Sequence, residues 1–160
     1  MQKSSYGRND RLIKEKRHDA YFNASKLSEH TVCIECGALF SNGRWTWKSH
    51  PVEVTNSHCP ACKRCADNYP AGRIALSGEF FRDHKDEIIN FIQNVGNQEK
   101  NERPLERIMN IRSERQSARV TTTGIHIARR IGEALSRAYK GDYSFKYLDE
   151  DDQIRVTWHR

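Results

Sequence analysis

Apolar and aromatic side chains recur every three or four residues in the stretch that follows residue 77. They are Phe81, His84, Ile88, Phe91, Ile92 and Val95. This spacing places them on one face of a helix, so the pattern predicts an amphipathic helix over residues 77–100 whose apolar face packs into the core. Ser77 is suited to be its N-cap, and Gly96 is expected to weaken or end its last turn.

Beyond residue 104 the period of the pattern changes twice. Two strands are predicted first, at Ile108–Ile111 and Ala118–Thr122, joined by a polar stretch. Helical spacing follows from Ile127 to Ala138, with a threonine supplying the N-cap. Alternation then returns over residues 143–147 and 154–158, on either side of an acidic turn. The order β-β-α-β-β predicts a helix packed on a small, mostly antiparallel sheet.

The cysteines carry the clearest chemistry in the sequence. Cys33 and Cys36 form one C-x-x-C pair, and Cys59 and Cys62 form a second. Each pair places two thiolates around one metal ion, and two pairs complete the tetrahedral shell that zinc prefers. Because four cysteines leave no open coordination position, the pattern predicts one structural Zn²⁺ rather than a catalytic one.

A fifth cysteine, Cys65, follows the second pair by three residues. It is an alternative ligand, a reactive thiol, or a small residue packed beside the metal site. His50 and His58 lie between the two pairs or next to the second one, and either of them could replace a cysteine in the shell.

Composition favours small modules over one large core. The chain has 160 residues, of which 36% are hydrophobic and 30% are charged. We expect an α+β protein in which a small zinc ribbon is followed by a helix and a β-β-α-β-β module, with a basic N-terminal tail. The expected segments are a flexible tail over 1–30, the ribbon over 31–70, a linker and amphipathic helix over 71–103, and the α/β module over 104–160.

The formal net charge of +6 favours a polyanionic partner. We interpret the tail as a basic arm that orders on nucleic acid, although a terminus with no role has the same composition. The stretch from Arg44 to Lys48 alternates tryptophans with cations, so the tryptophans are either the core of the ribbon or a platform for unpaired bases. Cations of the predicted helix suit a phosphate backbone, but equally a solvated face. The candidate RNA-binding residues are Arg8, Arg11, Lys14, Lys16, Arg17, Arg44, Trp45, Trp47, Lys48, Arg129, Arg130, Arg137 and Lys140.

Several classes of protein are not indicated. The sequence has no Walker loop, no G-x-G-x-x-G turn, no G-x-S-x-G elbow and no H-E-x-x-H helix. It has no run of apolar residues long enough for a membrane span, and its first residues do not resemble a secretory signal. We therefore expect a cytoplasmic protein with no membrane partner and no small-molecule substrate.

The paired C-x-x-C motifs, followed by Val120–Thr123, His126 and the run Ala128–Leu135, resemble the Nmd-three family. Members of that family are archaeal and eukaryotic adaptors of the large ribosomal subunit in late assembly and nuclear export. The chain also resembles short bacterial relatives with one ribbon. The resemblance implies binding to the large subunit at its intersubunit face, and it carries over the four zinc ligands. It does not imply export, because this chain has one ribbon, one α/β module and no recognisable export tail.

The leading hypothesis is a non-enzymatic zinc-ribbon protein that binds rRNA on the large ribosomal subunit as an assembly, hibernation or quality-control factor. A second hypothesis is a zinc-ribbon adaptor that binds another protein and not the ribosome. A third is an enzyme that uses Cys65 together with His58 or His84, which requires a thiolate beside a histidine.

Overall fold

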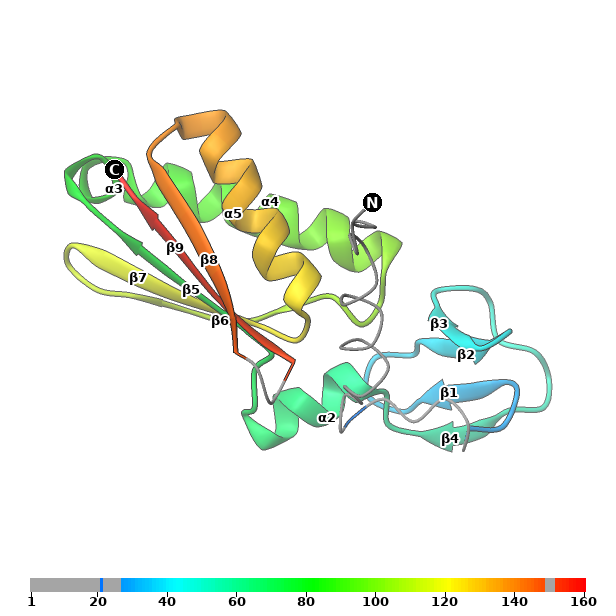
Figure 1. Ribbon diagram of the computed structural model, residues 1–160. Helices are drawn as coiled ribbons and strands as arrows, with labels where there is room; N and C mark the ends of the chain where they lie inside the picture. Colours follow the sequence, from blue (N-terminus) through cyan, green and yellow to red (C-terminus); the bar gives the residue numbers. More distant parts are fainter. Residues whose placement is uncertain (1–20, 22–26, 149–151) are drawn as a thin grey trace, which may run out of the picture.

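Two mixed sheets form the framework of the chain in the computed structural model, which describes residues 21, 27–148 and 152–160 (Figure 1). The small sheet precedes the large one in the sequence, and helices accompany both. The α+β class expected from the sequence is confirmed. The cations predicted to bind RNA from the tail lie outside the described residues; they are Arg8, Arg11, Lys14, Lys16 and Arg17.

The small sheet has the strand order β3-β2-β1-β4, in which β1 and β4 are parallel and the other pairs are antiparallel. A short helix, α2 (Pro60–Asp67), follows the last strand. A small core that includes Phe40 and Trp45 lies against the cysteines. The strands are β1 (Thr31–Cys33), β2 (Leu39–Ser41), β3 (Arg44–Thr46) and β4 (Thr55–Ser57).

The large sheet has five strands in the order β6-β7-β5-β9-β8. Only β5 and β9 are parallel, and the other neighbours are antiparallel. The strands are β5 (Gly72–Ser77), β6 (Ile108–Ser113), β7 (Ser117–Thr122), β8 (Asp142–Leu148) and β9 (Gln153–His159).

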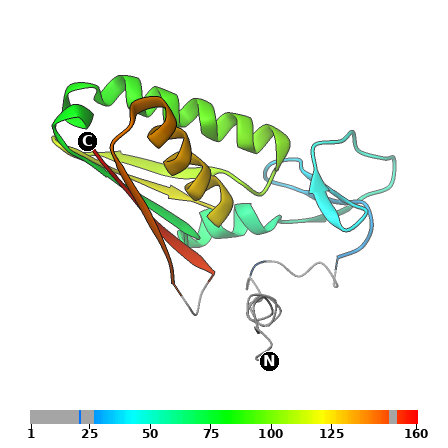
Figure 2. The ribbon, with the colours of Figure 1, turned by 45° about the horizontal axis from the view of Figure 1, so that its top comes forward.

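Three helices lie on one face of this sheet: α3 (Glu79–Asp83), α4 (Lys85–Glu102) and α5 (Ile125–Tyr139) (Figure 2). Apolar residues of α5 and α4 pack together with those of the strands in a single core. Within this core Trp158 and Phe81 are fully buried. The predicted packing of a helix on a mostly antiparallel sheet is therefore confirmed, with two more helices on the same face.

In the described ranges, no helix combines the length and the apolar character that crossing a membrane needs.

The central strand β5 was not predicted. The sequence pattern predicts a linker and a helix over residues 71–103, but β5, which lies in that range, hydrogen-bonds to both β7 and β9. Ser77 therefore ends a strand and does not cap a helix, and the predicted helix is divided into α3 and α4 at His84. Gly96 does not end α4, which continues to Glu102. The glycine is needed there for another reason: a side chain at this position would collide with Ile108 of β6.

The start of α5 is capped from a distance, and the predicted threonine cap is wrong. Gly124 occupies the N-cap position and makes no side-chain cap. Instead the Glu106 carboxylate accepts a hydrogen bond of 3.1 Å from the backbone N–H of Ile127. A negative group here also complements the positive end of the helix dipole.

Changing Gly124 to alanine is expected to destabilise the fold. A Cβ at this position would overlap the Glu106 carboxylate, which caps α5. Loss of a helix cap lowers the free energy of unfolding by about 1 kcal/mol. This loss exceeds the smaller gain that comes from restricting the unfolded chain when a glycine is replaced. The free energy of unfolding in urea should fall for Gly124→Ala and for Glu106→Ala, while Glu106→Gln retains an acceptor and falls less. Equal stability of Gly124→Ala and the wild type would show that Glu106 does not need this space.

Candidate metal centre

Parallel pairing of β1 with β4 brings the two cysteine pairs together. The register sets Cys33 opposite Ser57 at the same ends of the two strands. Each strand then runs directly into its own C-x-x-C motif, the first at Cys33 and the second at Cys59. Because parallel strands end on the same side of a sheet, two motifs that are distant in the sequence face each other.

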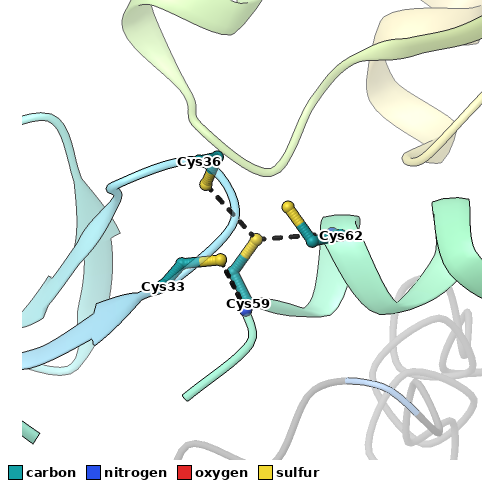
Figure 3. Close-up of side chains that lie close together, drawn as sticks. All are labelled: Cys33, Cys36, Cys59 and Cys62. Atoms are coloured by element: carbon teal, nitrogen blue, oxygen red, sulfur yellow. Dashed lines mark hydrogen bonds between the residues drawn. The ribbon is translucent and has the colours of Figure 1, made fainter. Parts of the chain in front are cut away.

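The ligand sulfurs of Cys33, Cys36, Cys59 and Cys62 all lie within 4.8 Å of one another (Figure 3). All four thiols are free, so no disulfide competes with a metal ion. Cys33 and Cys59 are buried. Four soft sulfur donors around one point are the ligand set of a structural zinc, and the predicted Zn²⁺ site is confirmed as a four-cysteine cluster, the one metal-binding group found in the described residues.

The backbone around the site orients the four sulfurs. Gly37 has a φ of +80° and donates its N–H to the carbonyl of Cys33 at 2.9 Å, which closes the first turn. This positive φ is the reason a glycine follows Cys36. Cys59 is the N-cap of α2, with Pro60 at the first helical position. The second pair therefore opens a helix, whose free N–H groups favour thiolates.

Backbone N–H groups also hydrogen-bond the sulfurs directly. The N–H of Cys59 lies 3.2 Å from Cys33 Sγ, and the N–H of Cys62 lies 3.4 Å from Cys59 Sγ. Burial raises the pKa of Cys33, but backbone hydrogen bonds outweigh it and lower that pKa to about 6. At Cys59 and Cys62 burial prevails and raises the pKa. These thiols must lose protons when zinc binds, so zinc affinity is expected to rise with pH.

An arginine that the sequence analysis missed covers the cluster. One guanidinium nitrogen of Arg107 lies 3.2 Å from Cys62 Sγ. The second terminal nitrogen of the guanidinium lies 3.1 Å from Cys36 Sγ and 3.3 Å from Cys59 Sγ. A zinc ion with four thiolates carries a net charge of −2, so one cation in contact with three of the sulfurs offsets part of it.

Arg107 is itself held in place from the large sheet. Its Nε donates to the carbonyl of Pro104 at 2.6 Å, and its backbone N–H donates to Thr123 Oγ1 at 2.8 Å. The neighbouring Leu105 packs against the core of the small module. The segment between α4 and β6 therefore joins the metal centre to the large sheet, at the end of β7.

The other candidate ligands lie outside the cluster of four sulfurs. His50 Nε2 is 2.7 Å from the carbonyl oxygen of Gly37, and His58 lies 3.5 Å from Glu35. Cys65 lines a cavity of about 660 Å³ together with His58 and Arg107. In the described part of the chain, no hydrogen bond joins Cys65 to a histidine. In the described structure, His50, His58 and Cys65 therefore do not join the four ligands, and Cys65 has no histidine hydrogen-bonded to it that would activate its thiol.

Cys65 is expected to react slowly with alkylating agents at neutral pH. Cys65 is exposed, but desolvation by the surrounding protein raises the pKa of its thiol, and the charge of Arg107 acts in the opposite direction. Because the thiolate is the nucleophile, a raised pKa leaves little reactive species at pH 7. Iodoacetamide labelling of the zinc-loaded protein, followed by mass spectrometry, should show Cys65 modified no faster than glutathione. Faster labelling would revive the hypothesis of a catalytic cysteine.

The two tryptophans of the ribbon have different environments. Trp45 is buried at 5% exposure and packs edge-on against Phe40, so its ring has no free face for a base. It belongs to the core of the ribbon, the alternative that the sequence left open. Strand β3 ends at Thr46, and Trp47 beyond it is 38% exposed. Trp47 Nε1 donates to the carbonyl of Lys100 on α4 at 2.6 Å.

The cations of the ribbon and of α5 are exposed, but they do not form one stripe. Arg44 and Lys48 border a cavity of about 730 Å³ between the ribbon and the end of α4. Arg129 faces β8, where it contacts Tyr147 and pairs with Glu133 at 3.1 Å. Arg130 faces α4 and pairs with Glu99 at 3.1 Å.

Glu99 is buried and also pairs with Arg103, at 2.9 Å. The charge of Arg130 is therefore engaged in holding α5 to α4. Arg137 and Lys140, further along α5 and at its end, are exposed, and in the described part of the chain no salt bridge involves them. These two are the cations of the predicted helical stripe whose charges remain available to a partner.

We compared the chain with protein-family models, with curated proteins and with solved structures, and none of the three comparisons gives a match.

Proposed function

We propose that the protein is a non-enzymatic, zinc-stabilised RNA-binding protein of the large ribosomal subunit. It binds rRNA at the intersubunit face in the cytoplasm, as an assembly, hibernation or quality-control factor. The observation that carries the non-enzymatic part of this proposal is the closed metal centre, in which four cysteines fill the shell and Arg107 covers three of the sulfurs.

A closed centre supports a structural role for the metal. Catalytic zinc keeps a coordination position for water or substrate, whereas four protein ligands leave none. The small module has only short strands and a small core, so the metal supplies most of what holds it together. The metal thus fixes a surface in place, which is the usual task of zinc in binding modules.

Charge and exposed side chains support RNA as the partner. The chain carries a formal net charge of +6, and rRNA is a dense polyanion. At the ribbon, the exposed ring of Trp47 is flanked by Lys48, which suits an unpaired base next to a phosphate. The resemblance to the Nmd-three family supplies the large subunit as the site.

Co-sedimentation tests this proposal. The zinc-loaded protein is centrifuged with separated large and small subunits at low and at high salt. It should pellet with the large subunit at low salt and be released at high salt, because phosphate contacts are weakened by salt. Protein that stays at the top of the gradient with both subunits at all salt concentrations would contradict ribosome binding.

A specific feature favours the second candidate function, a protein-binding adaptor. The ribbon exposes three aliphatic side chains, Ile34 at 58%, Val54 at 39% and Val52 fully. Apolar side chains exposed on a small module are candidate contacts for another protein where they lie side by side. If Ile34→Ser and Val52→Ser variants pellet with the large subunit as the wild type does, these side chains are not needed for that contact.

A further inference from the structure

The second face of the large sheet is open to solvent. The helices α3, α4 and α5 all cover the opposite face, and no described element lies over this one (Figure 2). Side chains of the central strands alternate strictly between buried and exposed. The outward residues include Arg73 and Ala75 of β5, Arg119 and Thr121 of β7, Arg155 and Thr157 of β9, Asn110 and Arg112 of β6, and Ser144 and Lys146 of β8.

Strand register sets the cations of this face side by side. Arg73 of β5 lies opposite Arg155 of β9, and Arg155 lies opposite Lys146 of β8. On the other side of β5, Arg112 of β6 lies opposite Arg119 of β7. Neighbouring strands are about 4.8 Å apart, so the first three cations form a row about 10 Å long. We call these five cations the open-face cluster.

Like charges placed directly opposite on neighbouring strands repel and destabilise a sheet. In the described residues, no salt bridge involves any member of the open-face cluster. Asp142 lies on this face at the far end of β8, opposite His159, and Glu114, in the turn after β6, accepts a hydrogen bond from Ser117 Oγ at 3.4 Å. The five cations outnumber these carboxylates, so the face keeps an excess of positive charge that a polyanion would complement.

The uncharged residues between the cations select the kind of polyanion. Apart from Ala75 they are small and polar, such as Asn110, Thr121 and Thr157, and side chains of this kind can donate hydrogen bonds to phosphate oxygens. In the described strands this face carries no phenylalanine, tyrosine or tryptophan, so it offers no ring on which an unpaired base stacks. A cationic sheet face without stacking rings fits the backbone of a duplex, which is bound by shape and charge.

We propose that the open-face cluster docks the phosphate backbone of duplex RNA. This inference rests on the proposed function for RNA as the class of partner, and it names the surface and the form of RNA that this surface takes. It assigns the main contact to the sheet rather than to the helix α5. The contact follows the backbone and not the bases, so its affinity depends on salt and little on sequence.

Matched triple variants test the assignment. The face variant carries Arg73→Gln, Arg119→Gln and Arg155→Gln, one from each central strand. The control variant carries Lys63→Gln, Arg82→Gln and Lys100→Gln, which removes the same charge from exposed positions of the helices α2, α3 and α4. Both are zinc-loaded full-length proteins whose folding is checked by circular dichroism. The probe is a labelled RNA duplex of about 16 base pairs, the length that other duplex-binding modules span, and anisotropy gives the Kd over a range of salt.

We expect the face variant to bind at least about tenfold more weakly and its log–log salt slope to fall by nearly three, since each of the three lost phosphate contacts removes a little under one. The control variant should bind within about twofold of the wild type. A DNA duplex of the same sequence that loses affinity in the same variant would support backbone recognition. A face variant that binds as the wild type does, or two variants that weaken equally, would overturn the assignment.

The outcome is separable from that of the proposed function. Large-subunit binding by the wild type with no effect of the face variant would retain the proposed function and reject this surface. Competition with polyglutamate provides the remaining distinction. If polyglutamate displaces the protein from the RNA duplex as well as unlabelled RNA does, an acidic protein fits the face equally, and the proposal of an RNA site fails.

Discussion

Replacement of Cys59 by serine is expected to abolish stoichiometric zinc binding and to unfold the small module. Cys59 is fully buried, caps α2, and its sulfur lies 3.8 Å from that of Cys36. Structural zinc contributes about 10–16 kcal/mol of apparent binding energy in small zinc domains, far more than the core around Trp45 can supply. Zinc content by mass spectrometry should fall from one to zero per chain, and residues 27–68 should become sensitive to protease.

The large sheet should survive this change, because it has its own core of fully buried residues such as Trp158 and Leu135. A protease-resistant fragment beginning near β5 is therefore expected from the Cys59→Ser protein. Cys65→Ser is the matched control, since Cys65 lies outside the group of four ligands, and it should retain one zinc. Retention of zinc by Cys59→Ser, or its loss from Cys65→Ser, would show that the ligand set is assigned wrongly.

Replacement of Arg107 by methionine is expected to weaken zinc binding by about 10–100-fold, the usual effect of removing a group that hydrogen-bonds the metal ligands. Methionine retains much of the buried stem but removes a charge and three contacts to sulfur. The site then holds a net charge of −2 with no nearby cation in contact with the sulfurs. Competition with a zinc chelator of known affinity measures the effect.

Two variants control for this result. Arg107→Lys keeps the charge but loses the fork that reaches several sulfurs, so its affinity should lie between those of the wild type and the methionine variant. Arg115→Met removes an exposed arginine in the turn between β6 and β7 and should leave zinc affinity unchanged. Wild-type affinity of Arg107→Met would mean that the guanidinium only packs against the site.

The metal ligands could be predicted from the sequence because their chemistry is local. Two C-x-x-C motifs specify four donors without any knowledge of the fold, and the positive φ of Gly37 agrees with its place after Cys36. The partner that completes the site could not be predicted. Arg107 follows Cys62 by 45 residues and reaches it only because the end of β7 fixes its backbone through Thr123.

The large sheet shows the same limit. The helical and alternating patterns of apolar residues predict α5 and four of the five strands of the large sheet, since each of these segments carries its own apolar pattern. Strand β5 escapes prediction because its apolar run is short and lies in the stretch assigned to the linker before the helix, and only pairing with β7 and β9 reveals it as central. The open-face cluster depends on that pairing. In the sequence alone, Arg119 and Arg155 are each visible as a cation between two apolar residues, as expected for an outward position on a strand.

A closed zinc centre of four sulfurs stabilises the small module. X-ray absorption at the zinc edge of the purified protein tests this arrangement most directly. The spectrum should show one zinc per chain with four sulfur neighbours at about 2.3 Å and no lighter neighbour in the shell. A shell of three sulfurs with an oxygen or nitrogen atom would contradict it, because that shell would indicate an open position or a histidine ligand.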